Sequence, residues 1–126
     1  MNLFAIELKA GAPIYEQVLY AARKAIISGE LKPDDPFPSV REIATHLRIN
    51  PNTVQKALVA LKSEGLVETV PGIGNRVRER PVARAADRAA LLDEDLEALV
   101  LRARQLRLTL TELNAALREH WERFRA

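Results

Sequence analysis

The sequence predicts a mainly α-helical protein with one small β-hairpin. Apolar residues recur at helical spacing in several stretches, each bounded by a capping residue, a proline or a glycine. One short stretch, residues 66–78, instead has strand-like residues on both sides of a glycine-containing turn. We therefore expect a helix-turn-helix followed by a hairpin in the N-terminal part, and two further helices after it.

The first predicted helix runs from about Pro13 to Ser28 and is ended by Gly29. Its apolar stripe consists of Ile14, Val18, Ala21, Ala22, Ala25 and Ile26. A loop follows at residues 32–36, because prolines there cannot continue a helix and disfavour helix in the residue before each. Asp34 and Asp35 in this loop lack a third ligand nearby in the sequence, so we interpret them as turn formers and not as a metal site.

The next two helices have well-defined starts. Ser39 and Glu42 form a capping box, which predicts a helix from about Val40 to Leu47. Asn50 can cap a second helix that begins at Pro51, where proline's missing N–H and fixed φ cost nothing. Its predicted buried stripe is Val54, Ala57, Leu58 and Leu61.

A hairpin follows these helices. Gly65 is a predicted left-handed C-terminal cap, residues 66–70 have the character of a strand, residues 71–75 turn the chain, and residues 76–78 return it. Two helices joined by a tight turn and followed by a hairpin make a winged helix-turn-helix. This is a shape that enters the grooves of DNA.

Several motifs in this region occur together with characteristic spacing. They are Pro13–Val18, Ser28–Leu31, Phe37–Glu42, Asn50–Val54, Glu64–Val67 and the glycine pair Gly72 and Gly74. Together they resemble the DNA-binding domain of the GntR transcription regulators over about the first 78 residues. The Asn-Pro-Asn-Thr-Val motif at residues 50–54 and the short segment after the hairpin are most similar to the YtrA subfamily. The resemblance implies that Arg41 touches DNA and that the wing around Gly72 approaches the minor groove.

The chemistry of the side chains suggests separate roles on DNA. Asn52 and Gln55 carry amides near the start of the third helix that suit bidentate contacts with adenine, so we expect them to read bases. Donors suited to phosphate are Ser39, Arg41, Thr53 and Lys56, and the expected wing contacts are Gly72, Asn75 and Arg76. Asn50 is a cap first and a DNA contact second. For Lys56 and Arg76, an ordinary solvated surface position is an equal alternative.

Two departures from the family pattern limit what the resemblance implies. Pro51 stands where many members have an arginine, and Gln55 stands where many have another basic residue, so their guanine contacts do not carry over. The wing also lacks the usual basic tip, because Pro71 and Ile73 replace polar or charged residues there.

The sequence changes character after a predicted linker at residues 79–84. Apolar residues then recur at spacings of 4, 3, 4, 3, 4 and 3, which is typical of a heptad seam: Ala85, Ala89, Leu92, Leu96, Leu99, Ala103 and Leu106. Thr109 and Glu112 form a second capping box. It opens a last helix whose apolar face is Leu110, Leu113, Leu117, Trp121 and Phe124.

Two helices of this size bury little alone, which predicts that a second copy of the chain covers the rest of the seam. The expected dimer contacts are Leu92, Leu96, Leu99, Ala103, Leu106, Leu113, Leu117 and Trp121. A helix over residues 85–107 would be about 35 Å long, close to the spacing of about 34 Å between paired recognition helices. We therefore expect residues 1–78 to form a DNA-binding domain and residues 85–126 to form a dimerisation domain.

Composition narrows the function classes. The 126 residues are 48% hydrophobic with a net charge of +2, so DNA affinity must come from local placement of charge. No apolar run approaches the roughly 18 residues of a membrane span, and the absence of cysteine and of a signal-peptide pattern favours the cytoplasm. Because His46 and His120 are far apart and no nucleophile or general base clusters, we expect no metal, no cofactor and no enzyme activity.

The sequence-based conclusion is a homodimeric transcription regulator, with repression as the simplest mechanism, that binds a pseudo-palindromic operator. Two alternatives stay open: a winged-helix protein–protein adapter that never touches bases, and a nucleic-acid enzyme. Any small-molecule effector would have to sit at the dimer interface or between domains, because two helices of one chain cannot enclose a pocket of about 300 Å³ or more.

Overall fold

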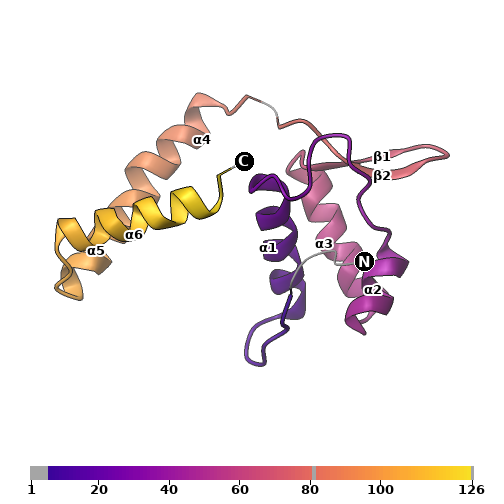
Figure 1. The fold of residues 1–126 in the computed structure, drawn as a ribbon, viewed down its shortest axis with the longest axis horizontal. Coiled ribbons are helices and arrows are strands. Elements are labelled where there is room, and N and C mark those ends of the chain that lie inside the picture. The colour runs from indigo at the N-terminus through magenta and orange to yellow at the C-terminus, as the bar shows by residue number, and fades with distance from the viewer. Residues whose placement is uncertain (1–5, 81, 126) are drawn as a thin grey trace. The chain divides into compact units, whose positions relative to one another are not determined.

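The computed structural model describes residues 6–80 and 82–125. The described residues up to Arg80 form one structural unit, and those from residue 82 to Arg125 form a second. Each unit is mainly helical, and the first carries a two-stranded antiparallel hairpin (Figure 1). The predicted fold class, mainly α with a small β-hairpin, is confirmed.

The first unit contains α1 (Ile14–Ile27), α2 (Val40–Leu47), α3 (Pro51–Ser63), β1 (Val67–Val70) and β2 (Gly74–Val77). The starts follow from the predicted caps. The Ser39 hydroxyl accepts a hydrogen bond from the Glu42 N–H at 3.1 Å, and the Asn50 side chain accepts from the Asn52 N–H at 2.8 Å. Both helices therefore begin where the sequence predicted.

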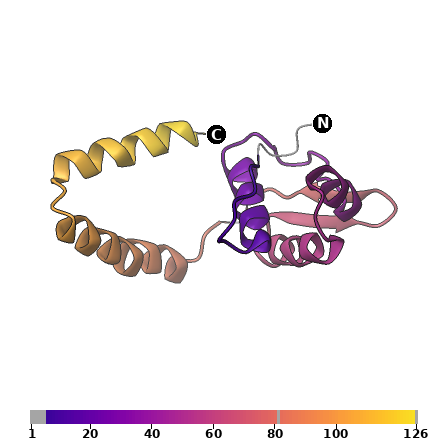
Figure 2. The same ribbon diagram turned by 90° about the horizontal axis from the view of Figure 1, so that it is seen from below.

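The core of the first unit is formed where α1 and α2 pack against α3, with the hairpin following the end of α3 (Figures 1 and 2). Its buried apolar residues are Val18, Leu19, Ala22, Ala25, Ile26, Phe37, Ile43, Ala44, Val54, Ala57, Leu58, Leu61, Leu66, Val67 and Val77. The predicted stripe of α3 is buried in full. Leu19 is also buried, although it is not part of the predicted stripe of α1, and Ile14, which is part of that stripe, is exposed.

The hairpin is tied to the helices by the loop before α2. Within the hairpin, Val67 pairs with Val77 and Glu68 pairs with Arg76. On its other side β2 makes backbone hydrogen bonds to the loop. The Asp34 N–H donates to the Val77 carbonyl and the Phe37 N–H donates to the Asn75 carbonyl, each at 2.9 Å. The wing therefore rests on the segment that leads into α2.

The second unit is a helix, a turn and a second helix. The first helix consists of α4 (Ala85–Ala89), the π-helical segment η1 (Ala90–Asp95) and α5 (Leu96–Gln105); the second is α6 (Leu110–Arg123). The predicted capping box forms, because the Thr109 hydroxyl accepts from the Glu112 N–H at 3.1 Å. Figure 2 shows that α5 and α6 diverge from the turn that joins them.

The π-helical segment changes the predicted heptad seam. Hydrogen bonds from residue i to i+5 widen the turn in this segment. Leu92, Leu96 and Leu99 still line one surface, as the heptad spacing predicts, and Leu91 lines it with them. A strict heptad count cannot anticipate this, because it assumes a constant number of residues per turn.

Candidate nucleic-acid interface

The N-terminal turns of α3 present polar side chains to solvent. Asn50 caps the helix through its side chain, Pro51 is the first helical residue, and both Asn52 and Gln55 are exposed. Asn52 and Gln55 are three residues apart, so they lie on one face of the helix. The opposite face is held in the core by Val54, which is 1% exposed. Burial of that face fixes the direction in which the two amides point.

The start of α2 supplies a second polar edge. Ser39 is half-buried as the N-cap, and Arg41 is exposed in the first turn. Thr53, in the first turn of α3, is half-buried. The N-terminus of a helix carries partial positive charge and outward N–H groups, so donors at these positions suit an anionic oxygen.

Lys56 is held by an aromatic ring from another helix. Its ammonium lies 4.7 Å from the ring centroid of Tyr15 at the start of α1. A cation over a tyrosine face is attracted by the ring quadrupole. Lys56 therefore has a partner within the chain, whether or not it also contacts DNA. No sequence pattern predicts the contact with Tyr15.

The tip of the wing is apolar and exposed. Gly72 and Gly74 have φ of +77° and +122°, which L side chains rarely adopt, and open space surrounds the Cβ that either would carry. Glycine is needed here for the turn and not for a close approach. Ile73 between them is 82% exposed. Asn75, a predicted contact, accepts a hydrogen bond from the Thr69 hydroxyl at 2.8 Å.

The arginines of the wing are engaged with a carboxylate. The Arg76 Nε lies 2.6 Å from Glu68 Oε1, and the Arg78 Nε lies 3.5 Å from Glu68 Oε2. The hydrogen bond that the Arg76 Nε–H donates to Glu68, followed by the negative charge of Glu68, raises the pKa of Arg76 above its ordinary value. Arg76 thus stays cationic and forms an ion pair with Glu68. The cross-strand pairing of the hairpin was the sequence signal that could have revealed this contact.

One basic residue at this surface was not among the predicted contacts. Arg48 is exposed in the turn between α2 and α3, and its φ of 56° and ψ of 50° are left-handed. A non-glycine residue in this conformation is uncommon. The predicted tight turn gave the position, but nothing local to Arg48 indicated its conformation.

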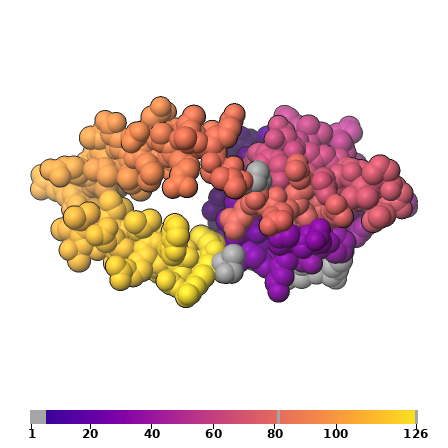
Figure 3. All heavy atoms as spheres, turned by 90° about the horizontal axis from the view of Figure 1, so that it is seen from above, coloured from indigo at the N-terminus to yellow at the C-terminus, as the bar shows by residue number. Residues whose placement is uncertain are grey.

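The second unit has an apolar groove between its two helices. Its volume is about 820 Å³, and it is open to solvent. It is lined by Leu91, Leu92, Asp95, Leu96, Leu99, Asn114, Leu117, Arg118, Trp121 and Glu122. In Figure 3 the two helices separate away from their turn. Five of the predicted dimer contacts therefore share one surface.

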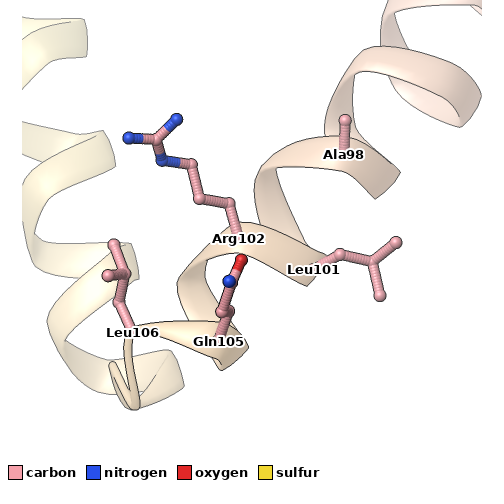
Figure 4. Close-up of a pocket in the computed structure, with 5 residues that line it drawn as sticks. All are labelled: Ala98, Leu101, Arg102, Gln105 and Leu106. Atoms are coloured by element: carbon pink, nitrogen blue, oxygen red, sulfur yellow. The ribbon is translucent and has the colours of Figure 1, made fainter.

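The other three predicted dimer contacts lie elsewhere in the unit. Ala103 is 6% exposed and its side chain is buried within the chain, while Leu113 is half-buried. Leu106 lines a smaller hollow with Ala98, Leu101, Arg102 and Gln105 at the end of α5 (Figure 4). These residues lie near the turn where the two helices meet.

Neither a metal cluster nor a membrane span is found in the described part of the chain. No group of three or more metal-ligating side chains comes together among residues 6–80 and 82–125. None of the helices over these residues has the length and apolar character needed to cross a bilayer.

The winged helix-turn-helix, with exposed amides on the second helix of the motif, defines a DNA-binding transcription regulator. Residues 14–77 match the family described as bacterial regulatory proteins, gntR family. The chain belongs to the GntR family of transcription regulators.

Similar proteins of known sequence or structure extend this match over nearly the whole chain. The transcriptional repressor YtrA of Bacillus subtilis is 33% identical over 93% of this chain and 91% of its own length. A transcriptional antiterminator from Listeria monocytogenes superimposes with a TM-score of 0.82 at 26% identity, covering 98% of this chain and 92% of that one. YtrA from Sulfolobus acidocaldarius gives 0.59 at 32% identity, covering 80% and 96%. The predicted likeness to YtrA is confirmed.

Proposed function

We propose that this regulator is a homodimeric repressor that reads a pseudo-palindromic operator. The observation that carries the proposal is the exposed amide pair Asn52 and Gln55 on the outward face of α3. Amides placed at the start of a recognition helix match the donor and acceptor pattern of adenine in the major groove. Their partners on DNA are base edges, so they specify the sequence.

The other predicted contacts of the first unit position the protein on the DNA backbone. Contacts to phosphate carry no sequence information directly but fix register and orientation. The proposed positioning residues are Ser39, Arg41, Asn50, Thr53, Lys56, Gly72, Asn75 and Arg76. Arg41 is the strongest of them, because it is exposed in the first turn of α2, where a cation and helix N–H groups act together.

The groove of the second unit supports dimerisation. Trp121 is 75% exposed and Leu99 is 46% exposed, although both line an apolar surface. Large aromatic and aliphatic side chains gathered in this way are typical of an interface core. We assign the groove to a second copy of the chain because a two-fold regulator requires self-complementary contact.

The proposal divides the chain by role. Residues 1–78 bind DNA, residues 79–84 link the two parts, and residues 85–126 dimerise. The protein acts in the cytoplasm, where its DNA is. Repression follows because an occupied operator is enough to block transcription, and the similar YtrA of Bacillus subtilis is named a repressor.

A pair of substitutions tests the division between reading and positioning. Gln55→Ala should lose about 1–3 kcal/mol of discrimination between the operator and a mismatched site. Arg41→Ala should weaken binding to every sequence and flatten the salt dependence, because it removes a phosphate contact. Fluorescence anisotropy with operator and scrambled duplexes over a salt series measures both quantities.

Exchange of the two effects would show that the roles are assigned the wrong way round. If neither Gln55→Ala nor Asn52→Ala altered binding to any duplex, the result would favour the alternative function, a protein–protein adapter that does not read bases. Glu30→Gln, at an exposed position beyond α1, is a matched surface control and should change neither discrimination nor the salt slope by a comparable amount.

A further inference from the structure

Glu68 occupies a central place in the wing. It lies on β1 directly across from Arg76 on β2. One carboxylate oxygen of Glu68 lies 2.6 Å from the Arg76 guanidinium, and the other lies 3.5 Å from that of Arg78. A single carboxylate thus bridges the two arginines that this hairpin offers to a phosphate backbone.

A second carboxylate acts on the same arginine. The Asp34 N–H donates to the Val77 carbonyl, which holds the loop against β2. The charge of Asp34 adds to that of Glu68 in raising the pKa of Arg76, with Glu68 the larger cause. Glu68 therefore contacts both guanidinium groups, while the charge of Asp34 adds a smaller attraction on Arg76 alone, so the positive charge that the wing presents to DNA is reduced.

These ion pairs are not needed to hold the hairpin. The side chains of Arg76, Glu68 and Arg78 are 44%, 35% and 48% exposed, and ion pairs in water contribute little to stability. The strands are already aligned by their backbone ladder and by the buried pair Val67 and Val77. The carboxylate therefore matters more for what the arginines can bind than for the fold.

We propose that Glu68, supported by Asp34, competes with DNA phosphate for Arg76 and Arg78 and so limits how strongly the wing binds DNA. The inference rests on the proposed DNA-binding role of the first unit. A phosphate that engages Arg76 meets a guanidinium whose Nε–H is already bound to Glu68, so it must share the cation with that carboxylate or displace it. Because phosphate contacts are made to any sequence, the competition lowers non-specific binding more than it lowers operator recognition by α3.

The test compares substitutions that each remove one negative charge. Glu68→Gln keeps the side-chain size and should bind a random duplex several-fold more tightly than wild type at low salt. Its slope of log K against log salt should steepen by about 0.9, the value for one more phosphate neutralised. Asp34→Asn should give a smaller change in the same direction, and asparagine tolerates the left-handed conformation of that position.

Glu79→Gln is the matched control. Glu79 is exposed two residues beyond the end of β2, so its removal changes the net charge equally but leaves the Glu68 contacts in place. It should produce only a small gain. In a background with Arg76→Ala and Arg78→Ala, the gain from Glu68→Gln should fall to that of the control. Thermal melts of all variants establish that they are folded.

Three results would overturn the inference. Weaker binding by Glu68→Gln than by wild type would mean that Glu68 orients Arg76 toward DNA. Equal gains from Glu68→Gln and Glu79→Gln, with wild type still binding DNA, would reduce the effect to net charge and would leave the proposed function standing. Wild-type protein that binds no duplex would overturn the proposed function together with this inference.

Discussion

The two units of this chain use the same local signals but differ in how far they close a core. Capping boxes start α2 at Ser39 and α6 at Thr109 with the same pair of hydrogen bonds. In the first unit, the helices that follow such caps meet around fully buried residues such as Leu61, at 1% exposed. Among residues 82–125, Ala103 is the only buried residue.

This difference shows that helix formation and core formation are separate requirements. The first unit brings three helices and a hairpin together, so each apolar stripe finds a partner within the chain. The second unit has two helices that leave Leu92, Leu96, Leu99 and Trp121 exposed. Apolar surface of this kind favours association. We infer that the first unit folds as a single copy and that the second is completed by another chain.

A charge placed in the groove should break the second unit's association. Leu99→Glu would bury an unpaired carboxylate, which costs about 3–5 kcal/mol, and should give monomers in sedimentation velocity with much weaker operator binding. Leu101→Glu is the matched control, because Leu101 is exposed but does not line the groove. A dimer that survives Leu99→Glu would show that this face packs within one chain.

Truncation of one leucine in each unit should have different consequences. Leu61→Ala removes a buried side chain and should lower the free energy of unfolding by about 2–5 kcal/mol, irrespective of protein concentration. Leu117→Ala, at an exposed position, should act only through the dimer, so its effect should shrink on dilution. Urea denaturation followed by circular dichroism at several concentrations measures both. Losses that are equal at every concentration would argue that the second unit closes its own core.

Removal of the corresponding helix cap in each unit should have a smaller effect, and it compares the two units in the same way. Ser39→Ala and Thr109→Ala each delete a hydroxyl that accepts from a backbone N–H, at a cost of about 1 kcal/mol. In the first unit the loss should appear in global stability. In the second it should appear as faster hydrogen exchange in the first turn of α6, most clearly in the Leu99→Glu monomer. Protection of that turn unchanged by Thr109→Ala would contradict a locally determined helix start.

The smallest expected effects come from two arginines in left-handed conformation. Arg48 ends α2 with φ of 56°, and Arg107 follows α5 with φ of 60°. Replacement by glycine relieves a cost of about 1 kcal/mol, partly offset by the greater freedom of the unfolded chain. Arg48→Gly should raise the melting temperature slightly and Arg48→Ala should not. A drop on Arg48→Gly would mean that contacts of the arginine outweigh its backbone strain.

Local chemistry explains which parts of the structure the sequence could predict. Ser39, Asn50 and Thr109 accept hydrogen bonds from N–H groups two or three residues away. The helix starts could therefore be predicted from residues that are close together in the sequence. The contact between Lys56 and Tyr15 joins residues distant in sequence, and no local pattern encodes it. The π-helical turn at residues 90–95 departs from the constant period that a heptad count assumes. The DNA and dimer contacts remain predictions, because they depend on a second molecule.

The proposal that the first unit reads DNA and the second unit dimerises is tested most directly by sequencing genomic DNA captured by the purified full chain at near-physiological salt. If two DNA-binding units are joined in a dimer, we expect enrichment of one short inverted repeat, with half-sites about one helical turn apart. Enrichment of single half-sites without fixed spacing, or uniform capture of all fragments, would contradict the account.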